Sequence, residues 1–137
     1  MEPWFLLSLI LHRPPQLVRA VYDIGGIDAV VVVEMESQFC ETALCREPQG
    51  TSWGLFQLYD HFHKQYRGDL LMHIVTGVAF LEDCKERAGG NFALAIAYYN
   101  GGSKPGAYSI AWGRRVEAKR AWLEARYEKA VEVRVCK

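Results

Sequence analysis

The chain has 137 residues, of which 50% are hydrophobic and 23% are charged, and its 16 Lys plus Arg are balanced by 16 Asp plus Glu. This length and composition predict a single globular domain with its own hydrophobic core and exclude a disordered chain. The balanced charge argues against a nucleic-acid binder, which would carry a basic excess. No apolar run approaches the roughly 20 residues that an integral membrane span needs.

The N-terminal segment, residues 1–11, is rich in apolar side chains and predicts a packed helix that ends before Pro14 and Pro15. An export signal is the alternative interpretation. Glu2 disfavours it, because a signal peptide carries Lys or Arg at its start, and no small-residue cleavage site follows.

The next part of the chain predicts one helix, one ambiguous segment and one loop. Residues 17–24 show a helical apolar stripe, which we expect to end at Gly25 and Gly26. In residues 27–39 the valines favour a strand, whereas the length and the lack of alternation favour a buried helix. Residues 40–53 contain several turn-forming residues and predict a long loop.

The second half predicts three helices, so the expected fold class is mostly α. Asp69 is expected to cap a helix with apolar residues at helical spacing over 70–84. Asn91 is expected to cap the next helix, over 92–99, which is apolar throughout and should therefore be central and buried. After a loop, residues 114–135 have a helix-rich composition.

The cysteines leave two interpretations open. Cys40, Cys45, Cys84 and Cys136 permit two disulfides in three pairings, and the first two are close enough in sequence to close a small loop. Four reduced thiols explain the count equally well, because no compartment signal decides between them. No CxxC pair supports a zinc site.

Glu36 is the strongest candidate for acid–base chemistry if residues 27–39 are helical. Its neighbours three and four positions away are then Val32, Val33, Phe39 and Cys40. Such a face removes water from the carboxylate and raises its pKa, which suits a general acid. The alternative is a carboxylate at a helix end with its head in solvent. Glu34, with Ser37 and Gln38 nearby, is expected to be hydrated or hydrogen-bonded.

Other groups of residues give little evidence of a functional site. His61 and His63 beside Asp60 could ligate a metal, but partly exposed imidazoles in a loop are the preferred interpretation. Trp112 and Trp122 are assigned to core packing. We predict no metal and no organic cofactor.

Four short motifs, in this order, resemble those of lytic transglycosylase (SLT) domains and also fit goose-type lysozymes. Each motif alone is weak, and the ordered set is what gives the resemblance its specificity. The segments are Glu36-Ser37-Gln38-Phe39, Gly54-Leu55-Phe56-Gln57-Leu58, Ala97-Tyr98-Tyr99-Asn100-Gly101-Gly102 and the weaker Glu124-Ala125-Arg126-Tyr127.

The resemblance implies a lysozyme-like single domain over residues 17–135 with a long saccharide-binding cleft. Residues 1–15 lie outside the match, and we expect an extra packed helix there, with a membrane-proximal segment as the alternative. The resemblance further implies that the segment 27–39 is a helix. The expected substrate is peptidoglycan, cleaved between N-acetylmuramic acid and N-acetylglucosamine, with Glu36 as acid and base. The substrate's own acetamido group replaces a second carboxylate, and the product is a 1,6-anhydro sugar.

The resemblance also implies roles for residues around Glu36. Gln57 is expected to line the cleft and bind saccharide, and Tyr99 to hydrogen-bond near Glu36 and hold its carboxyl. Asn100 would shape the same wall, and Ser37 would support the local hydrogen-bond network. Asp60 stands just beyond the position where the family often has Pro, and is a candidate second carboxylate that would favour hydrolysis.

Two alternatives remain beside the transglycosylase. One is a lysozyme-like hydrolase on the same fold, and the other is a non-catalytic cell-wall-binding or assembly domain. The stretch between Glu36 and Gly54 supports the second, since it is longer than is usual in the family and lacks its Ser-x-x-Gly-Ala run. Each places the protein at the cell wall, in the periplasm, outside the cell or delivered by a phage, with the oligomeric state left open.

Overall fold

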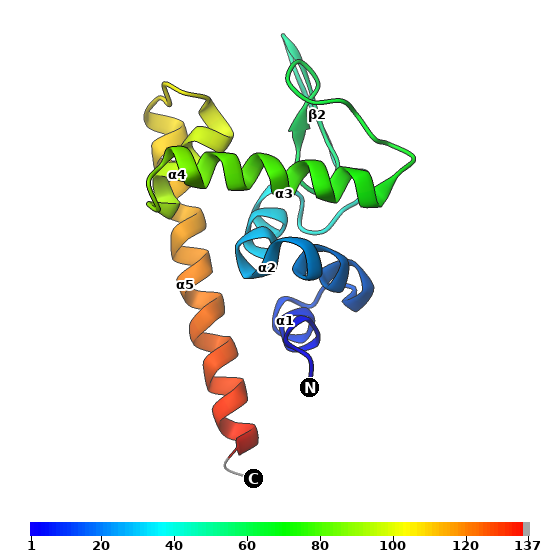
Figure 1. Ribbon diagram of the computed structural model, residues 1–137, viewed down its shortest axis with the longest axis vertical. Coiled ribbons are helices and arrows are strands. Elements are labelled where there is room, and N and C mark those ends of the chain that lie inside the picture. Colours follow the sequence, from blue (N-terminus) through cyan, green and yellow to red (C-terminus); the bar gives the residue numbers. More distant parts are fainter. Residues whose placement is uncertain (136–137) are drawn as a thin grey trace.

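The computed structural model describes residues 1–135, which form five helices and a small antiparallel sheet of three strands (Figure 1). The mostly α class and the single domain are as predicted. In chain order the elements are α1 (Pro3–Leu11), α2 (Pro15–Ser37), β1 (Leu44–Glu47), β2 (Gly50–Trp53), β3 (Leu58–Tyr59), α3 (Leu70–Arg87), α4 (Phe92–Gly101) and α5 (Ala107–Val135). Within this described part, no helix combines the length and the apolar character that crossing a bilayer requires.

α1 is the predicted N-terminal helix, and it packs on α2 and α5. His12 ends it in a left-handed conformation, and the prolines follow. Arg13 then reaches α2, where its Nε and Nη2 each donate a hydrogen bond of 2.8 Å to the buried Glu34 carboxylate. The paired carboxylate raises the pKa of Arg13. Glu34 is therefore hydrogen-bonded, one of the two environments expected for it.

α2 carries Glu36 in its last turn and runs through the segment that the sequence left ambiguous. Residues 30–33 are helical and at most 2% exposed, so the helical interpretation is confirmed and the strand is wrong. Burial of four valines outweighs their modest helix penalty. The predicted end at Gly25 and Gly26 is only a kink: Gly26 takes φ 67° and ψ −163°, and the helix resumes at once.

The predicted loop over residues 40–53 is wrong, because β1 and β2 form a hairpin there. Leu44 pairs with Trp53 and Glu47 with Gly50, and β3 adds to the other edge of β2 through the Trp53–Leu58 pair. All four β1 residues are exposed and all four β2 residues are partly exposed. With neither face buried, these strands lack the alternation by which a sequence reveals a strand.

The three C-terminal helices follow the predicted caps. The Asp69 and Asn91 side chains accept from the amides of Met72 and Leu94, as the first turns of α3 and α4 require. α5 begins at Ala107, earlier than composition suggested, and packs on α1, α2 and α4. Figure 1 shows α5 along one side, α1 and the last turns of α5 towards one end, and the sheet and the α4–α5 loop projecting at the other.

Cys40, Cys45 and Cys84 carry free thiols, the first two exposed and the third buried. The small Cys40–Cys45 loop is therefore not closed by a disulfide. Cys136 lies outside the described residues.

Candidate active site

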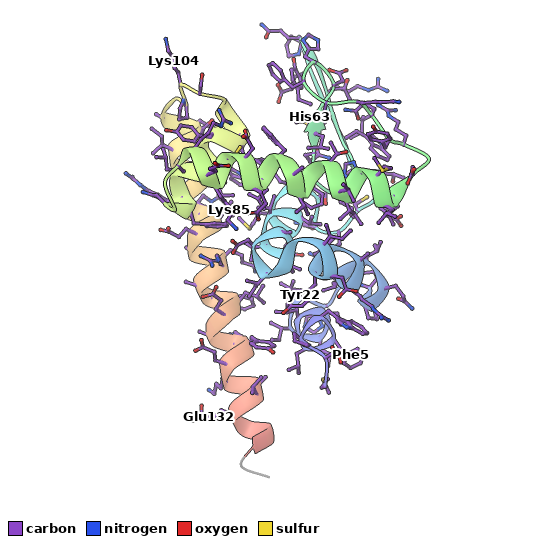
Figure 2. All side chains as sticks on the ribbon, viewed as in Figure 1. Phe5, Tyr22, His63, Lys85, Lys104 and Glu132 are labelled. Atoms are coloured by element: carbon purple, nitrogen blue, oxygen red, sulfur yellow. The ribbon has the colours of Figure 1, made fainter. Side chains whose placement is uncertain are left out.

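A cleft of about 700 Å³ lies between the sheet and the start of α5. Figure 2 shows its two sides, with His63 on the sheet side and Lys104 at the tip of the α4–α5 loop. α2 and α3 contribute Met35, Glu36 and Phe80. The sheet and the segments joined to it contribute Cys45, Glu47, Gln49, Ser52, Gln57, Leu58, Tyr59, Phe62 and His63. The other side consists of Tyr98, Tyr99, Asn100, Gly101, Gly102, Tyr108 and Trp112.

Glu36 is placed in this cleft by the end of α2. Gln38 and Phe39 take left-handed φ values of 53° and 60° and turn the chain away directly after the last helical turn. Burial raises the pKa of Glu36 to about 7, and a hydrogen bond from Trp112 opposes part of that rise. The desolvated environment predicted from its helical neighbours is thus present, and Glu36 can hold a proton near neutral pH.

Trp112 is a member of this site that the sequence interpretation assigned to the core. Its indole Nε1–H donates to Glu36 Oε1 over 3.1 Å, across 76 positions of the chain. Gly113 allows this approach, because a Cβ at that position would overlap the Ala93 carbonyl of α4. Only the packing of α5 on α4 brings Trp112 to Glu36, so no local pattern could have indicated the contact.

Tyr99 does not hold the Glu36 carboxyl, contrary to expectation. Its hydroxyl donates to the Phe56 carbonyl at 2.5 Å. Burial raises the pKa of Tyr99 well above its usual value, and the negative charge of nearby Glu36 adds to the rise. Tyr99 therefore lies close to Glu36, but its hydroxyl holds the loop between β2 and β3, which contains Phe56. A buried tyrosine hydroxyl needs a hydrogen-bond partner, and here the nearby acceptor is the Phe56 carbonyl.

His73 fixes the same loop from the other side, and the sequence interpretation gave it no role. Its Nε2 accepts the Phe56 N–H at 3.0 Å, while its ring packs edge-on against Trp53. Burial lowers the pKa of His73 to about 4. The imidazole is therefore neutral at physiological pH and able to accept this hydrogen bond.

Gln57 lines the cleft in a left-handed conformation with φ 49°. Its amide Nε2 donates to the carbonyls of Ala43 and Gly54, at 3.0 and 2.9 Å. The Gln57 side chain thus joins the start of the hairpin to the loop between β2 and β3, in which Gln57 lies. Asn100 also lines the cleft, and its Oδ1 accepts from Ser109 Oγ at 2.7 Å, which joins the end of α4 to α5.

Ser37 and Asp60, two other residues of the predicted site, are not among the described residues that border the cleft. Ser37 Oγ donates to the Val33 carbonyl within α2. Asp60 Oδ1 accepts the Thr51 N–H at 3.2 Å and so belongs to the sheet. The second carboxylate that borders the cleft is Glu47, which sequence reasoning missed because it assigned this stretch to a loop.

The described residues contain no group of three or more His, Cys, Asp or Glu side chains placed to hold a metal ion. His63 instead packs against Phe80 with ring centroids 4.4 Å apart, and burial lowers the pKa of His63. The His61 ring packs at a tilt against Tyr59, with ring centroids 4.9 Å apart.

Comparison with known proteins gives no match for this chain among protein-family models, curated proteins or solved structures. The chemistry of the cleft therefore has to be inferred from its own residues. They offer one acid that is protonated near neutral pH, a hydrogen-bond donor that holds it, and aromatic and polar side chains around it.

Proposed function

We propose that this protein is a peptidoglycan lytic transglycosylase in which Glu36 acts as both acid and base. The observation that carries the proposal is the Glu36 carboxyl, which borders the cleft with a pKa raised to about 7 by burial. A general acid works best when its pKa lies near the operating pH. The cleft falls within the range of about 300–1,000 Å³ that ligand sites usually span. The ordered motif set around Glu36, Gln57 and Tyr99 adds support from the sequence.

The first step is cleavage of the β-1,4 bond between N-acetylmuramic acid and N-acetylglucosamine. Protonated Glu36 donates its proton to the glycosidic oxygen, and the bond from that oxygen to C1 of the muramic acid breaks. The carbonyl oxygen of the muramic acid's own acetamido group bonds to C1 as the leaving sugar departs. No second protein carboxylate is needed on this route, which is a known departure from the paired-carboxylate scheme.

The second step restores Glu36 and releases the product without water. The Glu36 carboxylate takes the proton from the C6 hydroxyl, whose oxygen attacks C1 and displaces the acetamido oxygen. The product is a 1,6-anhydro sugar. In this proposal Gln57 and Asn100 contact the saccharide, while Tyr99 and His73 fix the cleft wall through Phe56. Ser37 supports α2 through its hydroxyl, which donates to the Val33 carbonyl.

A lysozyme-like hydrolase is the second candidate, and Glu47 is the observation that favours it. Glu47 replaces Asp60 as the possible partner carboxylate, because Glu47 borders the cleft and Asp60 bonds within the sheet. An inverting hydrolase would use such a residue to activate water. The products distinguish the two enzymes, since hydrolysis leaves a reducing end and transglycosylation leaves an anhydro end.

The test is a digest of purified peptidoglycan, read by mass spectrometry of the released muropeptides. We expect wild type to release products one water lighter than hydrolysis products. Glu36→Gln should lower their rate of release by about 10²–10⁴-fold, the usual contribution of a general acid or base. Glu128→Gln, the same chemical change at an exposed position of α5, should digest like wild type. Activity should fall as the pH rises above about 7, where Glu36 loses its proton.

The stability of the Glu36→Gln variant serves as a control for its folding. Glu36 binds a proton more tightly in the folded protein, at pKa about 7, than at its ordinary value of 4.5. Its contribution to stability is therefore complete below about pH 4.5 and is lost as the pH rises through 7. The loss is about 2–3 kcal/mol, since one pKa unit is about 1.4 kcal/mol and part of the side chain still meets solvent. Glu36→Gln should thus be more stable than wild type at pH 8.

Other products would change the assignment. Reducing-end products that disappear with Glu47→Gln would identify the hydrolase. Binding to peptidoglycan without release of any product would identify the cell-wall-binding domain and contradict the enzyme proposal.

A further inference from the structure

The two most exposed of the large apolar side chains in the described chain both border the cleft. Phe62 is 80% exposed and Tyr108 is 74% exposed. Phe62 follows β3, and Tyr108 lies in the first turn of α5, so the two residues come from the two segments between which the cleft lies. Figure 1 shows the sheet and the start of α5 apart from each other at the same end of the molecule. Leu71, the next most exposed at 61%, lies on α3 and is not a cleft residue.

Leaving these rings in water is energetically unfavourable, and a ligand that covers them would remove this cost. Burying a side chain of the size of phenylalanine is worth about 1.5–3 kcal/mol relative to leaving it in water. Exposed aromatic side chains gathered at a concave site mark interaction surfaces, whereas single exposed apolar residues elsewhere need no explanation. A ligand that runs through the cleft between the two rings would bury both.

The segments that carry the two rings are held by hydrogen bonds, so a ligand that covers the rings does not first have to order these segments. The Phe62 N–H donates to the Tyr59 carbonyl at 3.1 Å, and the two rings pack with centroids 5.7 Å apart. Tyr108 precedes Ser109, whose hydroxyl bonds to Asn100 and so joins α5 to α4.

The remaining side chains of the cleft define the chemistry of the ligand. Glu47, Gln49, Ser52 and Asn100 are polar, and a wholly apolar ligand would leave them without partners. The cleft lining includes no Lys or Arg among the described residues, so it does not suit a polyanion such as a nucleic acid. A pyranose ring combines an apolar C–H face with hydroxyl groups at its edge, and so matches flat aromatic faces beside polar groups that can accept and donate hydrogen bonds.

We propose that Phe62 and Tyr108 are stacking platforms that bind sugar rings of a glycan strand at the two rims of the cleft. The identity of the strand as peptidoglycan rests on the proposed function, whereas the stacking rests on the cleft geometry alone. The two residues contribute to binding along the strand and take no part in proton transfer.

The test measures binding of a β-1,4-linked N-acetylglucosamine hexamer by isothermal titration calorimetry, with the full chain carrying Glu36→Gln to prevent turnover. Adding Phe62→Ala or Tyr108→Ala should weaken binding about tenfold each. Phe62→Trp and Tyr108→Phe should bind like the parent, because each keeps a stacking face. Leu71→Ala is the matched control, an exposed apolar residue outside the cleft, and should leave affinity unchanged. All five changes are at exposed positions, so the thermal midpoints should stay within a few degrees.

A second readout separates this inference from the proposed function. In an otherwise wild-type chain, Phe62→Ala and Tyr108→Ala should raise KM for peptidoglycan while kcat stays within about twofold. If wild type releases no product but the alanine variants weaken hexamer binding, the stacking inference stands and the enzyme proposal fails. Parent-like hexamer binding by both alanine variants, or no binding by the parent, overturns the stacking inference. A loss with Tyr108→Phe as large as with Tyr108→Ala also overturns it, because the hydroxyl would then be the binding group.

Discussion

Replacing Trp112 with Phe tests the electrostatics of the site most directly. The change keeps an aromatic ring at the cleft and removes the N–H that donates to Glu36 Oε1 at 3.1 Å. A hydrogen bond to a charged group contributes about 1.5–3 kcal/mol, and one to a neutral group about 0.5–1.5 kcal/mol. The difference, about 1–1.5 kcal/mol, is what the indole contributes to the ionised form over the protonated form.

That difference converts to about one pKa unit. Since the hydrogen bond from Trp112 lowers the pKa of Glu36, its loss should raise that pKa from about 7 to about 8. Two neighbouring groups stay clear of this range: burial raises the pKa of Tyr99 well above 10, and burial lowers the pKa of His63. The carboxyl group of Glu47 also borders the cleft, so the NMR signal of Glu47 must be told apart from that of Glu36.

The measurement is a ¹³C NMR titration of glutamate-labelled protein between pH 5 and 9, in which the spectrum of Glu36→Gln identifies the Glu36 signal. This readout needs no enzymatic activity. Under the proposed function, the decline of activity at high pH should move upward by the same amount. Trp122→Phe is the control, because Trp122 lies farther along α5 between Lys119 and Arg126. An unchanged or lower pKa of Glu36 in Trp112→Phe would refute the reasoning, since the smaller ring would then have admitted water that reduces the desolvation of Glu36 or replaces the lost hydrogen bond.

Two further predictions concern the loop between β2 and β3, which contains Phe56 and borders the cleft. The folded protein keeps His73 neutral down to about pH 4 against an ordinary pKa of 6.5, so its contribution to stability is present above pH 6.5 and falls by about 3 kcal/mol as the pH drops to 4. In a Glu36→Gln background, which removes the opposite dependence of Glu36, urea unfolding should show this decline, and His73→Gln should abolish it; a decline that persists would assign it to other groups. A Cβ at Gly77 would overlap the Phe56 ring, so Gly77→Ala should lower the free energy of unfolding by about 1–3 kcal/mol. Gly68→Ala, where a Cβ meets nothing within 4 Å, should change it little, and equal effects of the two changes would contradict the packing argument.

The sequence by itself determined the features that depend on a residue and its near neighbours. Asp69 and Asn91 cap their helices because an acceptor side chain satisfies the free amides of a first turn wherever it stands. The desolvation of Glu36 could be predicted for the same kind of reason, since neighbours one helical turn away are fixed once the helix is assumed. That assumption came from the motif resemblance, because the valines alone favoured neither helix nor strand.

The tertiary structure decided the features that depend on distant segments. The hairpin is held by backbone pairing between strands with no buried face, so its side chains carry no periodic pattern. Trp112 reaches Glu36, and Tyr99 bonds to Phe56 and not to Glu36, through the packing of α5 and α4 on the rest of the chain. The sequence also offered Asp60 as a second carboxylate, whereas the fold places Glu47 at the border of the cleft and bonds Asp60 within the sheet. The packing of the helices decides which residues far apart in the chain become hydrogen-bond partners. That packing depends on all the side chains of the core together.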